Sequence, residues 1–293
     1  MKAETQLILN FTIMRLICKF TKQMSTIRST QQLQFEGYLR TPELWSDTSI
    51  FELEQLKFNL IQSHSMKQFP EMRLGMLVEQ FVIEAISQDP SNEIIARNVQ
   101  VVEDKITLGE LDALLKLNSE LIHLEIVYKF YLFDPKLSKN ELECWIGPNR
   151  RDSLVEKLTK LKEKQCSLLY HPKTREILTD LGHSAEQFQQ KVHFKAQLFI
   201  PHDSKNRKYE AVNNDCIEGV YFSREQLNGL KNHQFYIPTK LDWLTVPHHN
   251  VDWIDFSQFE MHVLELLDNK MSPMCWSKSD TKELNKFFVT VWE

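Results

Sequence analysis

The chain has 293 residues, of which 42% are hydrophobic and 26% charged, with only 7 Gly and 10 Pro. This composition excludes a disordered, collagen-like or low-complexity chain, because such chains lack the apolar content that offsets ~1–2 kcal/mol of backbone entropy per ordered residue. The formal net charge is −5. The field of the whole molecule therefore does not draw it onto nucleic acid, and only a local basic patch could do so.

The chain's five cysteines are scattered and never form a Cys-x-x-Cys pair. They are Cys18, Cys144, Cys166, Cys216 and Cys275. Their spacing excludes a zinc ribbon, a redox dithiol and a disulfide framework, and it indicates a reducing, cytoplasmic compartment.

One N-terminal stretch, residues 7–20, has some character of a membrane element. Polar or basic residues interrupt it at Asn10, Thr12, Arg15 and Lys19. It is also too short to cross a ~30 Å hydrocarbon core, and no small-residue cleavage site follows it. We expect a packed helix or strand here, or a chain that starts at Met24, and no membrane association.

The first clear elements are helices and then strands. Apolar residues recur with helical spacing over residues 55–60 and 74–86. Three β-rich segments follow, and breaks of hairpin length separate them: 94–102, 106–116 and 121–132. This spacing predicts a three-stranded antiparallel meander.

An amphipathic helix is predicted over residues 152–169, with Asp152 as its N-cap. A strand with alternating apolar residues is predicted over residues 191–200, and we expect it to join the same sheet. Shorter elements follow, a strand at 219–222 and helices at 223–230 and 257–267.

No internal repeat or long linker divides the chain, so we expect one compact unit with three parts. The parts are an N-terminal segment with helices (1–60), a core (61–205) and a C-terminal α/β appendage (206–293).

Charge is unevenly distributed along this unit. Residues 145–175 contain eight basic and three acidic side chains, whereas residues 241–269 contain six acidic side chains and neither Lys nor Arg. Nucleic acid binding, if present, therefore depends on the basic segment, because phosphate contacts supply most of such affinity. The candidate contacts are Arg150, Arg151, Lys157, Lys160 and Gln165.

Acidic residues gather on the predicted meander. Glu110 and Asp112 project from one face of the second strand, and Glu125 and Lys129 share a face of the third. Burying such charges in apolar surroundings requires a partner, and a divalent cation satisfies carboxylates well. The alternative is that each residue is solvated or forms a surface ion pair worth ~0–1 kcal/mol.

The order helix, three strands, helix, strand, with these acids and the lysine, resembles the PD-(D/E)XK nuclease superfamily. A closer similarity, to the bacterial domain-of-unknown-function family 1853, is carried by RLGMLVEQF (73–81), ITLGELDALL (106–115), HLEIVYKFYL (123–132), WIGPNRRDSLVEKLTKL (145–161) and IPTKLDWL (237–244). The resemblance implies an α/β (α+β) fold with a restriction-endonuclease-like core and metal-dependent hydrolysis of DNA or RNA.

By this resemblance, Asp112 and Glu125 hold Mg²⁺ (or Mn²⁺), Glu79 supports the metal from the first helix, and Lys129 orients or deprotonates the attacking water. In the superfamily the lysine follows the acid by two positions, where this chain has Val127. Lys129 lies four positions on, ~13 Å along an extended strand. A second hypothesis therefore stays open, a non-catalytic nucleic-acid-binding or assembly protein that retains a degenerate site.

Motifs of other enzyme classes are absent from the sequence. There is no Gly-x-Ser-x-Gly elbow and no Gly-x-x-x-x-Gly-Lys-Ser/Thr loop, and His248-His249 lacks a Cys or carboxylate at zinc spacing. Trp243, Trp253 and Trp276 could stack on bases, but their apolar neighbours favour core packing.

Overall fold

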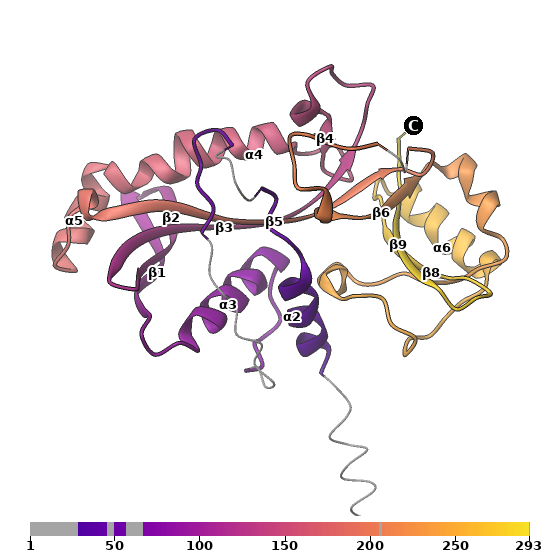
Figure 1. The fold of residues 1–293 in the computed structure, drawn as a ribbon, viewed down its shortest axis with the longest axis horizontal. Coiled ribbons are helices and arrows are strands. Elements are labelled where there is room, and N and C mark those ends of the chain that lie inside the picture. Colours follow the sequence, from indigo (N-terminus) through magenta and orange to yellow (C-terminus); the bar gives the residue numbers. More distant parts are fainter. Residues whose placement is uncertain (1–28, 46–49, 57–66, 205–206, 293) are drawn as a thin grey trace, which may run out of the picture.

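A mixed nine-stranded sheet organises the protein in the computed structural model, which describes residues 29–45, 50–56, 67–204 and 207–292 (Figure 1). The strands are β1 (Glu93–Glu103), β2 (Ile106–Leu117), β3 (Glu120–Phe133), β4 (Trp145–Ile146), β5 (Phe188–Pro201), β6 (Ile217–Phe222), β7 (Gln234–Tyr236), β8 (Met274–Lys278) and β9 (Leu284–Val289). Their order is β1-β2-β3-β5-β6-β9-β8-β7, and β4 also pairs with β3. The fold class is therefore α/β, as the sequence predicts.

Helices cover both faces of this sheet. They are α2 (Thr30–Arg40), α3 (Leu74–Ser87), α4 (Leu154–Lys160), α5 (Pro172–Asp180) and α6 (Phe256–Asp268). Shorter helical segments are η1 (Glu141–Cys144), η2 (Leu161–Gln165), η3 (Cys166–Tyr170), η4 (Ala185–Gln187), η5 (Asn214–Cys216), η6 (Arg224–Leu230) and η7 (Leu241–Leu244). In Figure 1, α2 and α3 lie on one side of the strands β1–β5 and α4 lies on the other.

The predicted meander is confirmed, because β1–β2 and β2–β3 are antiparallel hairpin pairs. The strand predicted after the basic helix is β5, which joins the same sheet and runs parallel to β3 from Leu121 to Leu132. The predicted helix over residues 74–86 is α3. The sequence thus predicted the central order of elements correctly.

Three local predictions need correction. Ser153, and not Asp152, caps α4, because its hydroxyl accepts the N–H of Glu156 and forms a capping box that Asp152 cannot form from one position earlier. Gln55 is not helical but makes an isolated bridge with Val192. The segment predicted as a helix at 223–230 is the 3₁₀ helix η6.

Residues 7–20 and 57–60, for which we also predicted elements, lie outside the described residues. The short predicted strand and the last predicted helix correspond to β6 and α6.

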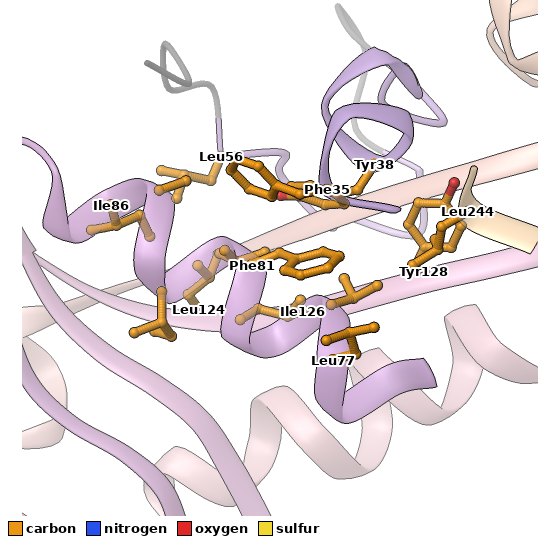
Figure 2. Packing of buried hydrophobic residues seen from close by; sticks show 14 of the residues in the cluster. Phe35, Tyr38, Leu56, Leu77, Phe81, Ile86, Leu124, Ile126, Tyr128 and Leu244 are labelled. Carbon is orange, nitrogen blue, oxygen red and sulfur yellow. The ribbon is translucent and has the colours of Figure 1, made fainter. Parts of the chain in front are cut away.

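The sheet separates two large apolar clusters around β3, and β3 contributes to both. Leu124, Ile126 and Tyr128 pack with α2 and α3, as Figure 2 shows, whereas Val127 and Tyr131 pack on the side of α4. A strand that buries both faces reads as a continuous apolar run, which explains the sequence of β3. Glu125, in the middle of β3, is consequently held in an apolar environment.

A chain of buried polar side chains links the regions of the fold. Thr41, after α2, bonds the Tyr128 hydroxyl at 2.7 Å, and that hydroxyl accepts an N–H of Gln197 on β5 at 2.8 Å. Lys286 on β9 then donates to Gln197 and to the carbonyl of Trp243, each at 3.0 Å. The strands that follow residue 206 are thereby joined to the core by both backbone and side-chain bonds.

Candidate active site

The strands β2 and β3 diverge at Asp112. β2 pairs with β1 along its length, but it pairs with β3 only from Ala113↔Leu124 to the hairpin turn. At the point of divergence, the Asp112 carboxylate oxygen Oδ2 accepts the backbone N–H of Ile126 at 2.8 Å. The Asp112 side chain therefore takes the place of the next backbone hydrogen bond between β2 and β3, which fixes its carboxylate. We call this point of divergence the fork.

Glu125 lies beside the fork and is completely buried, with an exposure of 0%. Its Oε1 is 3.1 Å from Nε2 of His123, and its Oε2 accepts a hydrogen bond from the side-chain amide of Gln165. Burial, followed by the charge of Glu125, raises the pKa of Asp112 from 3.8 to about 8. The sequence placed these two acids on adjacent strands, and the structure brings them close enough to interact electrostatically.

Two further carboxylates border the fork. The side-chain amide of Asn98 donates to Glu79 Oε2 at 3.1 Å and to Glu110 Oε1 at 3.0 Å. Burial is the main cause of a raised pKa of Glu79, and the charges of Glu110 and Glu125 add to it. Asn98 adopts a left-handed backbone with φ of 50°, a conformation that Asn tolerates better than most residues.

These carboxylates do not form a complete metal cage. Within the ranges that the structure describes, no three His, Cys, Asp or Glu side chains converge closely enough to make a ready metal site. Asp112 and Glu125 are nevertheless hard oxygen donors, the type that Mg²⁺ prefers, and Mg²⁺ is commonly held by only one or two protein carboxylates.

Lys129 occupies a different position from the one that its predicted role requires. Its ammonium Nζ lies 2.6 Å from Oδ2 of Asp152, in the segment before α4, and forms no hydrogen bond or ion pair with Asp112 or Glu125, which are both among the described residues. Val127, at the usual lysine position, is buried in the apolar layer beneath α4. The fork therefore receives no lysine from β3 itself.

A lysine instead approaches the fork from α4. Lys157 donates through Nζ to Oε1 of Gln165 at 2.7 Å, and Gln165 in turn donates to Glu125. Burial lowers the pKa of Lys157 to about 8, against the opposing effect of the Glu125 and Asp112 charges. The sequence analysis predicts Lys157 and Gln165 as nucleic-acid contacts rather than as neighbours of Glu125.

The helix carrying these residues contains a π turn over Leu161–Gln165. Such a turn inserts one residue into an α-helix, and such insertions are frequent at functional sites. Because the residues after it are rotated relative to a regular helix, helical periodicity alone cannot place Gln165 on the same side as Lys157.

A family model described as Domain of unknown function (DUF1853) matches residues 21–289. The chain belongs to this family. No curated protein and no solved structure matches it. Membership confirms the closer of the two resemblances found in the sequence.

The other basic residues of this DUF1853 chain that the sequence predicts as nucleic-acid contacts, Arg150, Arg151 and Lys160, divide into two kinds. Arg150 bonds Asp134 through Nη2, and its guanidinium lies 4.3 Å from the ring centre of Trp292, so it is engaged within the protein. Arg151 and Lys160 are exposed, and neither is paired with an acidic side chain in the part of the chain that the structure describes.

None of the helices described combines the length and apolar character needed to traverse a bilayer.

Proposed function

We propose that this protein is a Mg²⁺-dependent nuclease and that the fork between β2 and β3 is its active site. The observation that carries the proposal is the hydrogen-bonded series Lys157, Gln165 and Glu125 beside the carboxylate of Asp112, at the point where two strands separate. The surrounding order supports it, since α3, the β1–β3 meander, α4 and the parallel strand β5 follow the sequence expected of a restriction-endonuclease-like core.

The donor set of the fork suits Mg²⁺. Asp112 uses only Oδ2 in a hydrogen bond among the described residues, and its pKa is raised by burial and, to a smaller extent, by the nearby charge of Glu125. A divalent cation relieves this repulsion, because both acids are stabilised in their charged form by it. Asp112 and Glu125 would hold the ion, with Glu79 supporting it from α3.

When bound, Mg²⁺ supplies an acidified water and a clamp for phosphate oxygens. Lys157 contributes a cation that stabilises the charge developing on the phosphoryl group. Gln165 positions Lys157 and Glu125 relative to each other, and His123 holds Glu125 from its other side.

The four cysteines described are buried and free, which supports a reducing, cytoplasmic setting for this reaction.

The decisive experiment is a cleavage panel of duplex DNA, single-stranded DNA and RNA with Mg²⁺ or Mn²⁺. We expect metal-dependent cleavage by the wild type and a loss of about 100-fold or more in Asp112→Asn and Glu125→Gln, as is usual when charge stabilisation is removed. Asp104→Asn, an exposed acid in the turn between β1 and β2, is the matched control. Cleavage that survives both site substitutions would refute the proposal.

A second candidate is a binding or assembly protein without activity. The ion pair of Lys129 with Asp152 favours it, because this lysine is not free to act at the fork. Nucleic acid binding with Ca²⁺, combined with no cleavage by the wild type in Mg²⁺ or Mn²⁺, would favour this alternative over the nuclease.

A further inference from the structure

A pocket of about 790 Å³ lies along β3 beyond the fork. Its walls come from the start of α3, from residues Tyr128 to Phe130 of β3, from the segment before α4 and from η7. Four separate parts of the chain therefore build it.

The pocket lies along the same unpaired stretch of β3 that begins at the candidate active site. β2 has left β3 after Leu124, and β4 joins β3 only at Leu132, so the stretch between them has an open edge. Ile126, whose N–H binds the Asp112 carboxylate, precedes Tyr128 by two residues, or ~6.6 Å along a strand. This distance is about that between neighbouring phosphates of a nucleic acid strand.

One wall of the pocket is an aromatic ring held in place by other rings. Trp243 is half-buried, and its ring meets those of Phe130 and Phe288 edge to face, with centroids 5.3 Å and 5.1 Å away. Lys240 lies over Trp243, with its Nζ 5.7 Å from the ring centre. A rigid ring beside a cation suits a base and its phosphate, because aromatic rings stack with bases regardless of sequence.

The lining has three basic side chains, Arg73, Lys129 and Lys240, against two acidic ones, Glu71 and Asp152, an excess that favours an anion. Lys129 is neutralised by Asp152, but Arg73 and Lys240 are exposed and have no acidic partner among the residues described. The helix α3 begins here, with no acidic residue in its first turn and no side-chain cap, so the positive end of its dipole is not compensated.

We propose that this pocket binds an unpaired nucleotide adjacent to the scissile phosphate, and hence that the substrate is single-stranded nucleic acid. Trp243 stacks on the base, and Arg73 and Lys240 contact phosphate. A base inside a duplex has both faces covered by its neighbours, so only an unstacked base reaches such a ring. The proposal rests on the nuclease function for its scissile phosphate, but its binding test does not depend on cleavage.

The test measures binding of a short labelled oligothymidylate and of a duplex of the same length, with Ca²⁺ in place of Mg²⁺. Trp243→Leu should weaken oligothymidylate binding about 5- to 150-fold, from ~1–3 kcal/mol per stacked base, and affect the duplex little. Trp243→Phe should retain most of the binding. Removing Arg73 and Lys240 together should reduce the salt slope by ~1.4, at ~0.7 per contact for single strands.

Lys278→Ala is the matched control, because Lys278 lies over another tryptophan, Trp253, with its Nζ 4.8 Å from the ring centre, and neither residue lines this pocket. It should leave binding unchanged. Equal losses on single strand and duplex in Trp243→Leu, or no loss, would overturn the proposal. If Trp243→Leu does not fold, as judged by thermal unfolding, the exposed pair Arg73→Ala/Lys240→Ala decides, and an unchanged salt slope would then reject the pocket.

The two proposals fail in different ways. If binding depends on Trp243 and no cleavage occurs, the nucleotide-pocket proposal is supported and the nuclease proposal is refuted. Cleavage that depends on Asp112 but is indifferent to Trp243 on single strands keeps the nuclease and rejects the pocket.

Discussion

The substitution Asp112→Asn measures how much the buried charge of Asp112 lowers the free energy of unfolding, because it leaves the geometry of the fork in place. Asn retains an oxygen that can accept the Ile126 N–H but carries no charge. The pKa of Asp112 is raised from 3.8 to about 8, and this difference corresponds to an upper bound of roughly 6 kcal/mol at 1.36 kcal/mol per unit. A third of that bound, roughly 2 kcal/mol, shifts Tm by about 3 °C for a chain of 293 residues, at ~2.1 cal/mol/K of unfolding entropy per residue.

The sign follows from proton binding. Below pH ~4 the carboxyl is protonated in both states and contributes no difference. As pH rises from about 4 to about 8, the unfolded chain releases this proton while the folded protein retains it, so folded wild type loses stability relative to Asp112→Asn. Above about pH 8 the difference is constant.

The assay is thermal unfolding of wild type and Asp112→Asn from pH 5 to pH 9 in EDTA, with Asp104→Asn as the exposed control. We expect the Tm advantage of Asp112→Asn to grow with pH and to level near pH 8, and the control to show no such trend. Adding Mg²⁺ should then stabilise wild type by ~2.7 kcal/mol at 100 times its dissociation constant, and the variant much less. An advantage that is the same at all pH values would refute the reasoning.

Three further predictions concern Lys157 and Gln165 beside the fork and Gly219 on β6. If Lys157 acts as a cation, the cleavage rate should fall above pH 8, because Lys157 loses its charge as its lowered pKa is passed. Lys157→Arg should keep activity at alkaline pH, where Lys157→Met has none. A wild-type rate that still rises above pH 9 would contradict this role. Gln165→Leu removes the partner of a buried carboxylate and should lower the free energy of unfolding in urea by about 1–3 kcal/mol, so an unchanged midpoint would argue against the bridge. Gly219→Ala should destabilise strongly, since a Cβ there would overlap the carbonyl oxygen of Lys286, whereas Gly229→Ala meets open space; equal melting temperatures would show the two positions to be equivalent.

The sequence was sufficient for the centre of the fold because its strands are long and its breaks have hairpin length. It was less informative beyond residue 206, where β7, β8 and β9 were not predicted. These strands are three to six residues long. β7 pairs with β8 (Gln234↔Lys278) and β6 with β9 (Gly219↔Lys286), both far apart along the chain, and only β8–β9 is a local hairpin. Local periodicity does not reveal the long-range pairs.

For the candidate site, the positions of Asp112 and Glu125 followed from period-two spacing, which a regular strand preserves. The approach of Lys157 did not, because it depends on how α4 crosses the sheet and on the π turn that follows. The pairing of Lys129 with Asp152 was equally hidden, since it depends on the path of the segment before α4. Sequence spacing thus predicts contacts within an element better than those between elements.

The buried polar chain from Thr41 through Gln197 to Lys286 has a consequence for dissecting the protein. A chain cut after residue 205 would leave one edge of β5 without β6 and would leave Gln197 and Tyr128 without the ammonium that completes their bonding. Exposed edges of this kind invite pairing with other chains. The segment that ends with β5 should therefore be recovered as aggregates when expressed alone, and as a folded, non-aggregating protein only together with β6–β9.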